Sequence, residues 1–291
     1  MAWRTKAEFL PAQPPANAQC HRIDFTQSNP PLPEYKDLCA AVIDNAFTKE
    51  ECDELLRLAE ASTIPSTKPG DRTAAAAAAA AREPTWERAM INLGNGKQAL
   101  AVDTRNCGRI IYDSPELANK LLARLRPFLQ ELGGIEVIDH QPRVTGLAGR
   151  NAVYRLTRLN ERLRFLKYEG GEYFRPHWDG RYRTPDGRET SYYTVHLYLN
   201  GDGEQDRAEL MREMKRVEKG EGVVNMDTQG PLLGGATSFL PRFEEKERHL
   251  RIFPRTGSVL VFQQNDLLHG GDPVIRGVKY TMRTDIMYRR D

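Results

Sequence analysis

The chain has 291 residues, of which 40% are hydrophobic and 28% charged, and its formal net charge is +2. This composition is typical of a globular protein with a sizeable core, in one large domain or two small ones. The near-neutral charge, without a long basic run, argues against nucleic acid as a partner. No segment is apolar enough to predict a membrane helix or a signal peptide, and the four scattered cysteines indicate reduced thiols. We therefore expect a cytoplasmic protein with no membrane partner.

Residues 1–36 are rich in proline and predict an extended N-terminal arm, which either packs along the domain or stays mobile. The alanine run at 74–81 has a high helix propensity but is too short to form a stable helix by itself. We expect a surface linker or a short helix there.

Residues 37–150 predict a helical support region that packs on the core. The stretch AVIDNAF predicts a short strand. Thr48 and Glu51 fit a capping box, and apolar residues at helical spacing extend the predicted helix to about residue 61. A second helix is predicted at 114–132, where a serine stands at the N-cap and two glycines follow the end.

Residues 151–291 change to a β pattern, in which short apolar and β-branched runs are separated by turn residues. The runs are RLRFLKY, SYYTVHLYLN, GGATSF, GSVLVFQQ and VKYTMRTDIMY. This series predicts a mainly β fold, a double-stranded β-helix of the jelly-roll or cupin-like kind, with supporting N-terminal α-helices. A charged segment near 202–224 interrupts it and predicts an inserted helix, which is either a solvated surface helix or a lid over a site.

The stretch RPHWDG places a histidine and a carboxylate two residues apart. On an extended strand, His177 and Asp179 point to the same face. His269, in NDLLHGG after another predicted strand, is the candidate third ligand. Two histidines and one carboxylate form a facial triad that leaves coordination positions open, which suits non-haem Fe(II) oxygen chemistry. Ten residues further on, Lys279 could hold the remote carboxylate of a dicarboxylic cosubstrate, or it could be a surface lysine.

The order of these motifs resembles the prolyl-4-hydroxylase-type Fe(II)/2-oxoglutarate-dependent dioxygenases. The motifs are Tyr168, the H-x-D of 177–179, TVHLYLN, GGATSF, GSVLVF, LLHGG and Lys279, and the resemblance covers roughly residues 160–288. A weaker resemblance to the family's N-terminal helical support includes AVIDNAFTKEECDELL and RNCGRIIYDSPELANKLL.

The resemblance implies that the three candidate ligands bind Fe(II), with 2-oxoglutarate and O2 as cosubstrates and ascorbate as a candidate reductant. It implies that decarboxylation of 2-oxoglutarate to succinate and CO2 is coupled to oxidation, usually hydroxylation, of an unactivated C–H bond. Lys279 would bind the C5 carboxylate of 2-oxoglutarate, assisted by the hydroxyl of Tyr198. Thr237 and Tyr168 fall at pocket-lining positions, and the alternative for Tyr168 is a core tyrosine.

Two polar residues depart from the family pattern. His196 and Arg283 lie where the family commonly has apolar or small residues. His196 shares a strand face with Tyr198, and Arg283 shares one with Lys279, so both should enter the barrel together with those residues. A buried polar group needs a partner. His196 is therefore either a hydrogen-bonded core histidine or a substrate contact.

Arg283 has three candidate partners, namely Asp285, Glu172 and a substrate carboxylate. Arg164 shares a strand face with Tyr168 and is a further candidate substrate residue. A charged pocket of this kind favours a small carboxylate-bearing substrate, such as an amino acid or a related metabolite, over a protein. The alternatives are a peptidyl-prolyl hydroxylase that acts on a protein, a cupin-like metalloenzyme that does not use 2-oxoglutarate, and an inactive metal-binding scaffold.

Overall fold

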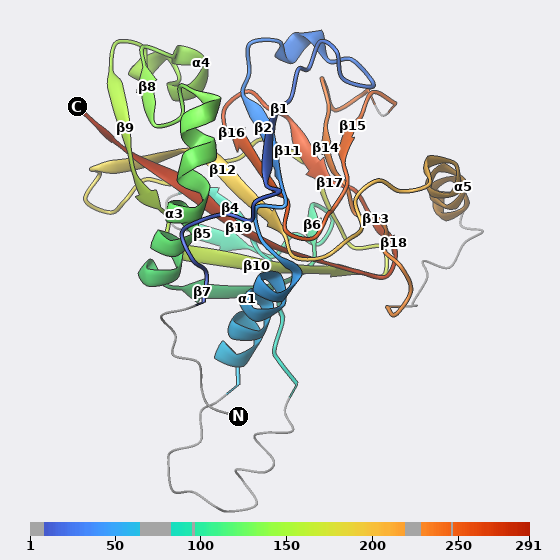
Figure 1. The fold of residues 1–291 in the computed structure, drawn as a ribbon. Helices are drawn as coiled ribbons and strands as arrows, with labels where there is room; N and C mark the ends of the chain where they lie inside the picture. The colour runs from blue at the N-terminus through green and yellow to red at the C-terminus, as the bar shows by residue number, and fades with distance from the viewer. Residues whose placement is uncertain (1–8, 65–82, 95–96, 219–227, 246) are drawn as a thin grey trace, which may run out of the picture.

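The computed structural model describes residues 9–64, 83–94, 97–218, 228–245 and 247–291 (Figure 1). The helices are α1 (Lys49–Ser62), α3 (Pro115–Leu132), α4 (Pro142–Thr145) and α5 (Arg207–Glu218), with 3-10 turns η1 (Pro33–Tyr35) and η2 (Leu147–Gly149). The surface linker or short helix predicted for the alanine run at 74–81 lies outside the described residues.

A ten-stranded antiparallel sheet forms the largest layer of the molecule. Its main path runs β1-β2-β16-β12-β19-β10-β7-β3, and β9, which also carries β8, pairs with β19. The strands are β1 (Gln19–Arg22), β2 (Ala40–Asp44), β3 (Glu87–Arg88), β7 (Gly108–Asp113), β8 (Val137–Asp139), β9 (Val153–Leu159), β10 (Arg162–Glu169), β12 (Glu189–Tyr198), β16 (Val259–Gln263) and β19 (Val278–Arg290).

A five-stranded antiparallel sheet, in the order β15-β14-β17-β11-β6, forms the second layer. Its strands are β6 (Arg105–Asn106), β11 (Tyr173–His177), β14 (Thr237–Phe239), β15 (Leu250–Ile252) and β17 (His269–Gly271). Two pairs complete the described strands, β4 (Ile91–Gly94) with β5 (Lys97–Ala99), and β13 (Leu233–Gly234) with β18 (Val274–Arg276). Side chains from both layers line one cavity between them. The predicted mainly β, jelly-roll class of fold is therefore confirmed.

The alternation of side chains along β12 and β19 separates the core from the cavity. Val195 and Met282 point into an apolar cluster shared with α1 and α3, whereas His196 and Lys279 point into the cavity between the sheets. The predicted sharing of faces along these two strands is confirmed.

Helices α1 and α3 cover the outer face of the large sheet, where Leu55 and Leu121 are buried. The predicted capping box is present in α1, because the Thr48 hydroxyl accepts from the Glu51 N–H and the Glu51 carboxylate accepts from the Thr48 N–H. Both predicted helices are confirmed. They support the site from behind and contribute no side chain to the cavity.

The described part of the proline-rich arm packs along the domain. It forms β1 at the edge of the large sheet and buries Phe25 and Leu32 against Phe239 and Phe262. The division of the chain at residues 36 and 150 stays a prediction, but the large sheet takes strands from all three predicted segments.

The charged segment near 202–224 contains α5, and residues 219–227 lie outside the described part of the chain. Helix α5 is attached by Leu210, which packs with Leu233 and Phe253, and by an ion pair between Glu209 and Arg276. Its described residues do not line the cavity between the sheets. The interpretation of this helix as a lid therefore finds no support in its position.

Candidate metal centre

Strand pairing brings together the three residues that the sequence predicts as metal ligands. His177 ends β11 and lies opposite His269 at the start of β17, and Asp179 follows β11 by two residues. The Nε2 atom of His177 is 3.6 Å from Oδ1 of Asp179, and Nε2 of His269 is 3.7 Å from Oδ2. All three ligand atoms lie within 4.8 Å of one another, as a shared ion would require.

The backbone fixes the orientation of both imidazole rings. Nδ1 of His177 lies 2.8 Å from the carbonyl oxygen of Arg175, and Nδ1 of His269 lies 3.0 Å from that of Leu267. A carbonyl oxygen only accepts, so each Nδ1 carries the proton and each Nε2 keeps its lone pair for a metal. Phe174 stacks on the His177 ring with a centroid distance of 3.7 Å and holds it in place.

The protonation states also suit a metal. Burial is the main factor that lowers the pKa of His269 to about 4, so the ring is neutral at physiological pH. Burial by itself would raise the pKa of Asp179, but the Arg283 guanidinium and the two histidines outweigh it and hold that pKa well below its usual range. Metals bind neutral imidazole and ionised carboxylate.

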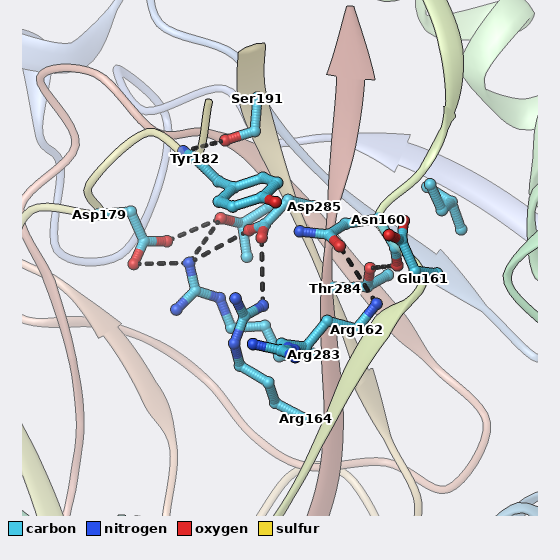
Figure 2. Close-up of polar contacts among 12 residues, drawn as sticks. Asn160, Glu161, Arg162, Arg164, Asp179, Tyr182, Ser191, Arg283, Thr284 and Asp285 are labelled. Carbon is cyan, nitrogen blue, oxygen red and sulfur yellow. Dashed lines mark hydrogen bonds and ion pairs between the residues drawn. The ribbon is translucent and has the colours of Figure 1, made fainter. Parts of the chain in front are cut away.

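Arg283 lies directly against the candidate ligand Asp179 (Figure 2). Its Nη2 atom is 2.9 Å from Oδ1 of Asp179 and 3.4 Å from Oδ1 of Asp285. The Thr194 hydroxyl donates to the other Asp179 oxygen at 2.7 Å. Of the predicted protein partners of Arg283, Asp285 is confirmed and Glu172 is wrong, because Glu172 pairs with Arg88 instead. The contact with Asp179 was missed, since sequence spacing does not show which strands face each other.

Asp285 is the centre of a polar network behind Arg283. Arg164 reaches its Oδ2 atom at 3.2 Å, and Gln264 donates to Oδ1 at 3.1 Å. Ser191 in turn donates to Gln264 at 2.9 Å. Arg164 therefore enters the site as predicted, and its observed partner is a carboxylate of the protein (Figure 2).

Lys279 lies in the cavity between the sheets, 2% exposed. Its Nζ atom is 5.2 Å from the centre of the Tyr168 ring and 5.7 Å from that of Tyr198. The Tyr198 hydroxyl donates to the Thr237 hydroxyl at 2.8 Å. Burial lowers the pKa of Lys279 to about 8, and no ion pair joins it to a carboxylate of the described residues. The other three predicted cosubstrate residues, Tyr168, Tyr198 and Thr237, thus lie around the buried ammonium group of Lys279.

His196 faces the same cavity, and its Nε2 atom is buried without a hydrogen-bond partner among the described residues. Burial is the main factor that holds the pKa of His196 well below its usual range, so the ring is neutral. The interpretation of His196 as a hydrogen-bonded core histidine is therefore wrong for this nitrogen. A buried nitrogen without a partner beside a candidate metal centre is available to a ligand.

A second cavity of about 440 Å³, which we call the outer cavity, is lined by two of the candidate ligands, His177 and Asp179. Its most distinctive feature is a set of arginine side chains that belong to four different parts of the chain, namely Arg105, Arg109, Arg164, Arg181 and Arg283. The sequence interpretation missed Arg105 and Arg109, because RNCGR was taken as part of the helical support. The available signal was their spacing, since 105, 107 and 109 share one face of an extended chain.

A comparison with known protein families bears on the class of reaction. Residues 163–284 match the model of the 2OG-Fe(II) oxygenase superfamily. This stretch contains the three candidate ligands and Lys279, and its match supports an enzyme that depends on Fe(II), 2-oxoglutarate and O2. The predicted resemblance is confirmed at this level.

Solved structures with similar folds include several prolyl hydroxylases. A viral collagen prolyl hydroxylase from Paramecium bursaria Chlorella virus-1 shares 16% identity and has a TM-score of 0.44, with 86% of this chain and 96% of that chain covered. A Pseudomonas putida prolyl-4-hydroxylase shares 15% identity and has a TM-score of 0.46, with 87% and 95% covered. A search of curated proteins gave no match. In the described part of the chain, no helix is long and apolar enough to cross a membrane.

Proposed function

We propose that His177, Asp179 and His269 hold Fe(II) and that the enzyme uses it to oxidise, most simply to hydroxylate, a C–H bond of a small carboxylate-bearing molecule. The observation that carries this proposal is the convergence of two imidazoles and one ionised carboxylate beside a buried lysine that makes no ion pair with any described residue. Three protein ligands of this kind would leave open positions on Fe(II), and the metal would supply the oxidising chemistry together with 2-oxoglutarate and O2.

Lys279 is the proposed partner of the C5 carboxylate of 2-oxoglutarate. A buried ammonium without a counter-ion is unfavourable, and a dicarboxylate supplies that counter-ion. Tyr198 and Thr237 form a hydroxyl pair beside it, and the Tyr168 ring centre lies 5.2 Å from the Lys279 Nζ atom. Ascorbate as a reductant stays a prediction.

The proposed substrate class follows from the charge of the outer cavity. Five arginines line it, together with two aspartates, Asp179 and Asp285, that already accept from arginines. A cavity with this excess of positive charge favours a negatively charged substrate.

A second candidate function is hydroxylation of prolyl residues in a protein. Trp178, which lines the outer cavity, is 54% exposed, and it makes an edge contact of 5.1 Å with Phe243, which is 47% exposed. Exposed aromatic pairs at the mouth of a site are suited to contact an extended peptide. The two candidates therefore differ in whether the substrate enters the cavity completely or lies across its mouth.

The test is a measurement of succinate formed from 2-oxoglutarate by the Fe(II)-loaded enzyme, with amino acids, other small carboxylates and proline-containing peptides as separate substrate classes. The proposal expects stimulation by small carboxylates and none by peptides. Stimulation by peptides alone would establish the second candidate. His177→Ala is the control, since it should abolish turnover with either class.

A further inference from the structure

Two arginines of the outer cavity lack the counter-ion that buried guanidinium groups normally have. Arg105 and Arg109, from β6 and β7, are only 7% and 5% exposed. The Nε atoms of both are buried without a hydrogen-bond partner in the described part of the chain. Within the same described ranges, Arg109 also makes no ion pair, and its partner across the strands, Glu87, is not within ion-pair distance.

The charges around Arg109 add to this imbalance. Burial lowers the pKa of the Arg109 guanidinium, and the positive charge of Arg105 lowers it further. Glu87 raises this pKa by less than Arg105 lowers it, and Arg164 makes a smaller lowering contribution. The neighbouring carboxylate, Asp285, already accepts from Arg164. Within the described residues, Arg109 therefore has no carboxylate at ion-pair distance, and the more distant Glu87 offsets its charge only in part.

The Arg105 side chain has neighbours that restrict its position more than those of Arg109 do. Its guanidinium carbon lies 4.6 Å from the centre of the Phe174 ring, and Tyr168 and Cys107 are its polar neighbours. Phe174 is also the residue that stacks on His177. Arg105 lines both the cosubstrate cavity and the outer cavity, so it marks the place where the two adjoin.

We propose that Arg109, together with Arg105, binds the carboxylate of the substrate in the outer cavity. This inference rests on the proposed function, which makes that cavity the substrate site. A guanidinium group offers a planar pair of N–H donors that matches a carboxylate in a bidentate arrangement. His177 and Asp179 line the same cavity, so a molecule anchored at Arg109 extends toward the metal centre.

The experiment uses the full chain loaded with Fe(II) under anaerobic conditions. Saturating 2-oxoglutarate is present, so that Lys279 is already occupied by the cosubstrate. The probes are propionate, its uncharged amide propionamide, and methyl phosphate, and the readout is the shift of the unfolding temperature. We expect a saturable rise with propionate and none with propionamide. In Arg109→Gln the apparent affinity for propionate should fall at least tenfold.

Arg162→Gln is the matched control, because Arg162 is a neighbouring arginine on β10 that is half exposed and paired with Asp113. It should bind propionate like the wild type. Arg109→Gln should fold, since no described carboxylate forms an ion pair with Arg109 and would be left without its partner. Arg109→Lys is the second variant, and it should keep part of the affinity through its charge.

Three results would overturn the inference, namely no effect of propionate on the wild type, an equal effect on Arg109→Gln, or a response to methyl phosphate alone. Failure of the proposed function is detected separately. In that case the charge-transfer band of 2-oxoglutarate bound to Fe(II) would be missing from the wild type before any probe is added.

Discussion

Lys279 is the residue on which binding of 2-oxoglutarate is proposed to depend. It is buried, and no described carboxylate pairs with it, so Lys279→Ala should remove a charge-assisted contact that the protein cannot replace. We expect KM for 2-oxoglutarate to rise by about tenfold to a hundredfold, which corresponds to roughly 1.4 to 2.7 kcal/mol. Steady-state succinate formation measures it.

Lys167→Ala is the control for this substitution, because Lys167 lies on the adjacent strand and pairs with Glu169 outside the cavity. KM for 2-oxoglutarate should stay unchanged in that variant. An unchanged KM in Lys279→Ala would remove Lys279 from the cosubstrate site.

The lowered pKa of Lys279 predicts a pH dependence. Because burial lowers this pKa to about 8, the free enzyme loses the ammonium charge as the pH rises through 8. Catalytic efficiency with respect to 2-oxoglutarate, kcat/KM, should therefore be highest below pH 8 and fall above it, since this parameter reports the free enzyme. In Lys279→Arg the charge persists, and the fall should move to higher pH. Identical pH profiles for the two proteins would contradict the assignment.

We expect that Arg283 positions Asp179 and that its main role is not a contact with the substrate. Its guanidinium holds one carboxylate oxygen at 2.9 Å while Thr194 holds the other. Loss of such a partner of a metal ligand typically weakens metal binding or activity by about 10- to 100-fold. Arg283→Met should therefore weaken Fe(II) binding, measured by anaerobic titration, whereas Arg162→Met should not. Unchanged Fe(II) affinity with loss of substrate oxidation alone would instead assign Arg283 to the substrate.

At the scale of elements, Glu51 at the N-terminus of α1 joins this helix to α3. Glu51 completes the capping box with Thr48, and it also pairs at 2.7 Å with Arg124 of α3, which is 1% exposed on its side chain. The two losses differ in energy. Removal of the Thr48 hydroxyl leaves only a backbone N–H without a partner, whereas removal of Glu51 leaves the buried charge of Arg124 without its carboxylate.

We therefore expect Thr48→Ala to lower the free energy of unfolding by about 1 kcal/mol and Glu51→Ala by about 3–5 kcal/mol. Urea denaturation measures both. KM for 2-oxoglutarate should be the same in both folded variants, because neither residue lines the cavity. Equal losses of stability would show that the Arg124 pair contributes little.

The sequence was sufficient to predict the elements whose signal is local. The capping box at Thr48 and the serine cap of α3 depend on residues three apart, and both are present. The alternation along VKYTMRTDIMY predicted which side of β19 faces the cavity. The contact between Arg283 and Asp179 and the role of Phe174 beside His177 could not be predicted, because they depend on how two sheets face each other.

At the scale of the whole molecule, the candidate site combines segments that are far apart in the chain. Arg105 and Arg109 come from the region predicted as helical support, yet they line the outer cavity together with His177 and Asp179. The sequence analysis assigned that region to the helical support because a predicted helix follows it, and the two arginines were included in that assignment. The site therefore needs the complete arrangement of both sheets, and a fragment limited to 163–284 would lack two of its cations.

The central claim is that Fe(II) bound by the triad takes up 2-oxoglutarate beside Lys279. The most direct measurement is the visible absorption of the anaerobic, Fe(II)-loaded protein as 2-oxoglutarate is added. We predict a weak, saturable metal-to-ligand charge-transfer band in the wild type and in Arg162→Gln, and no band in His269→Ala. If Fe(II) binds to the wild type but no band develops, the keto acid does not chelate the metal, and the proposed role of Lys279 and its cavity is wrong.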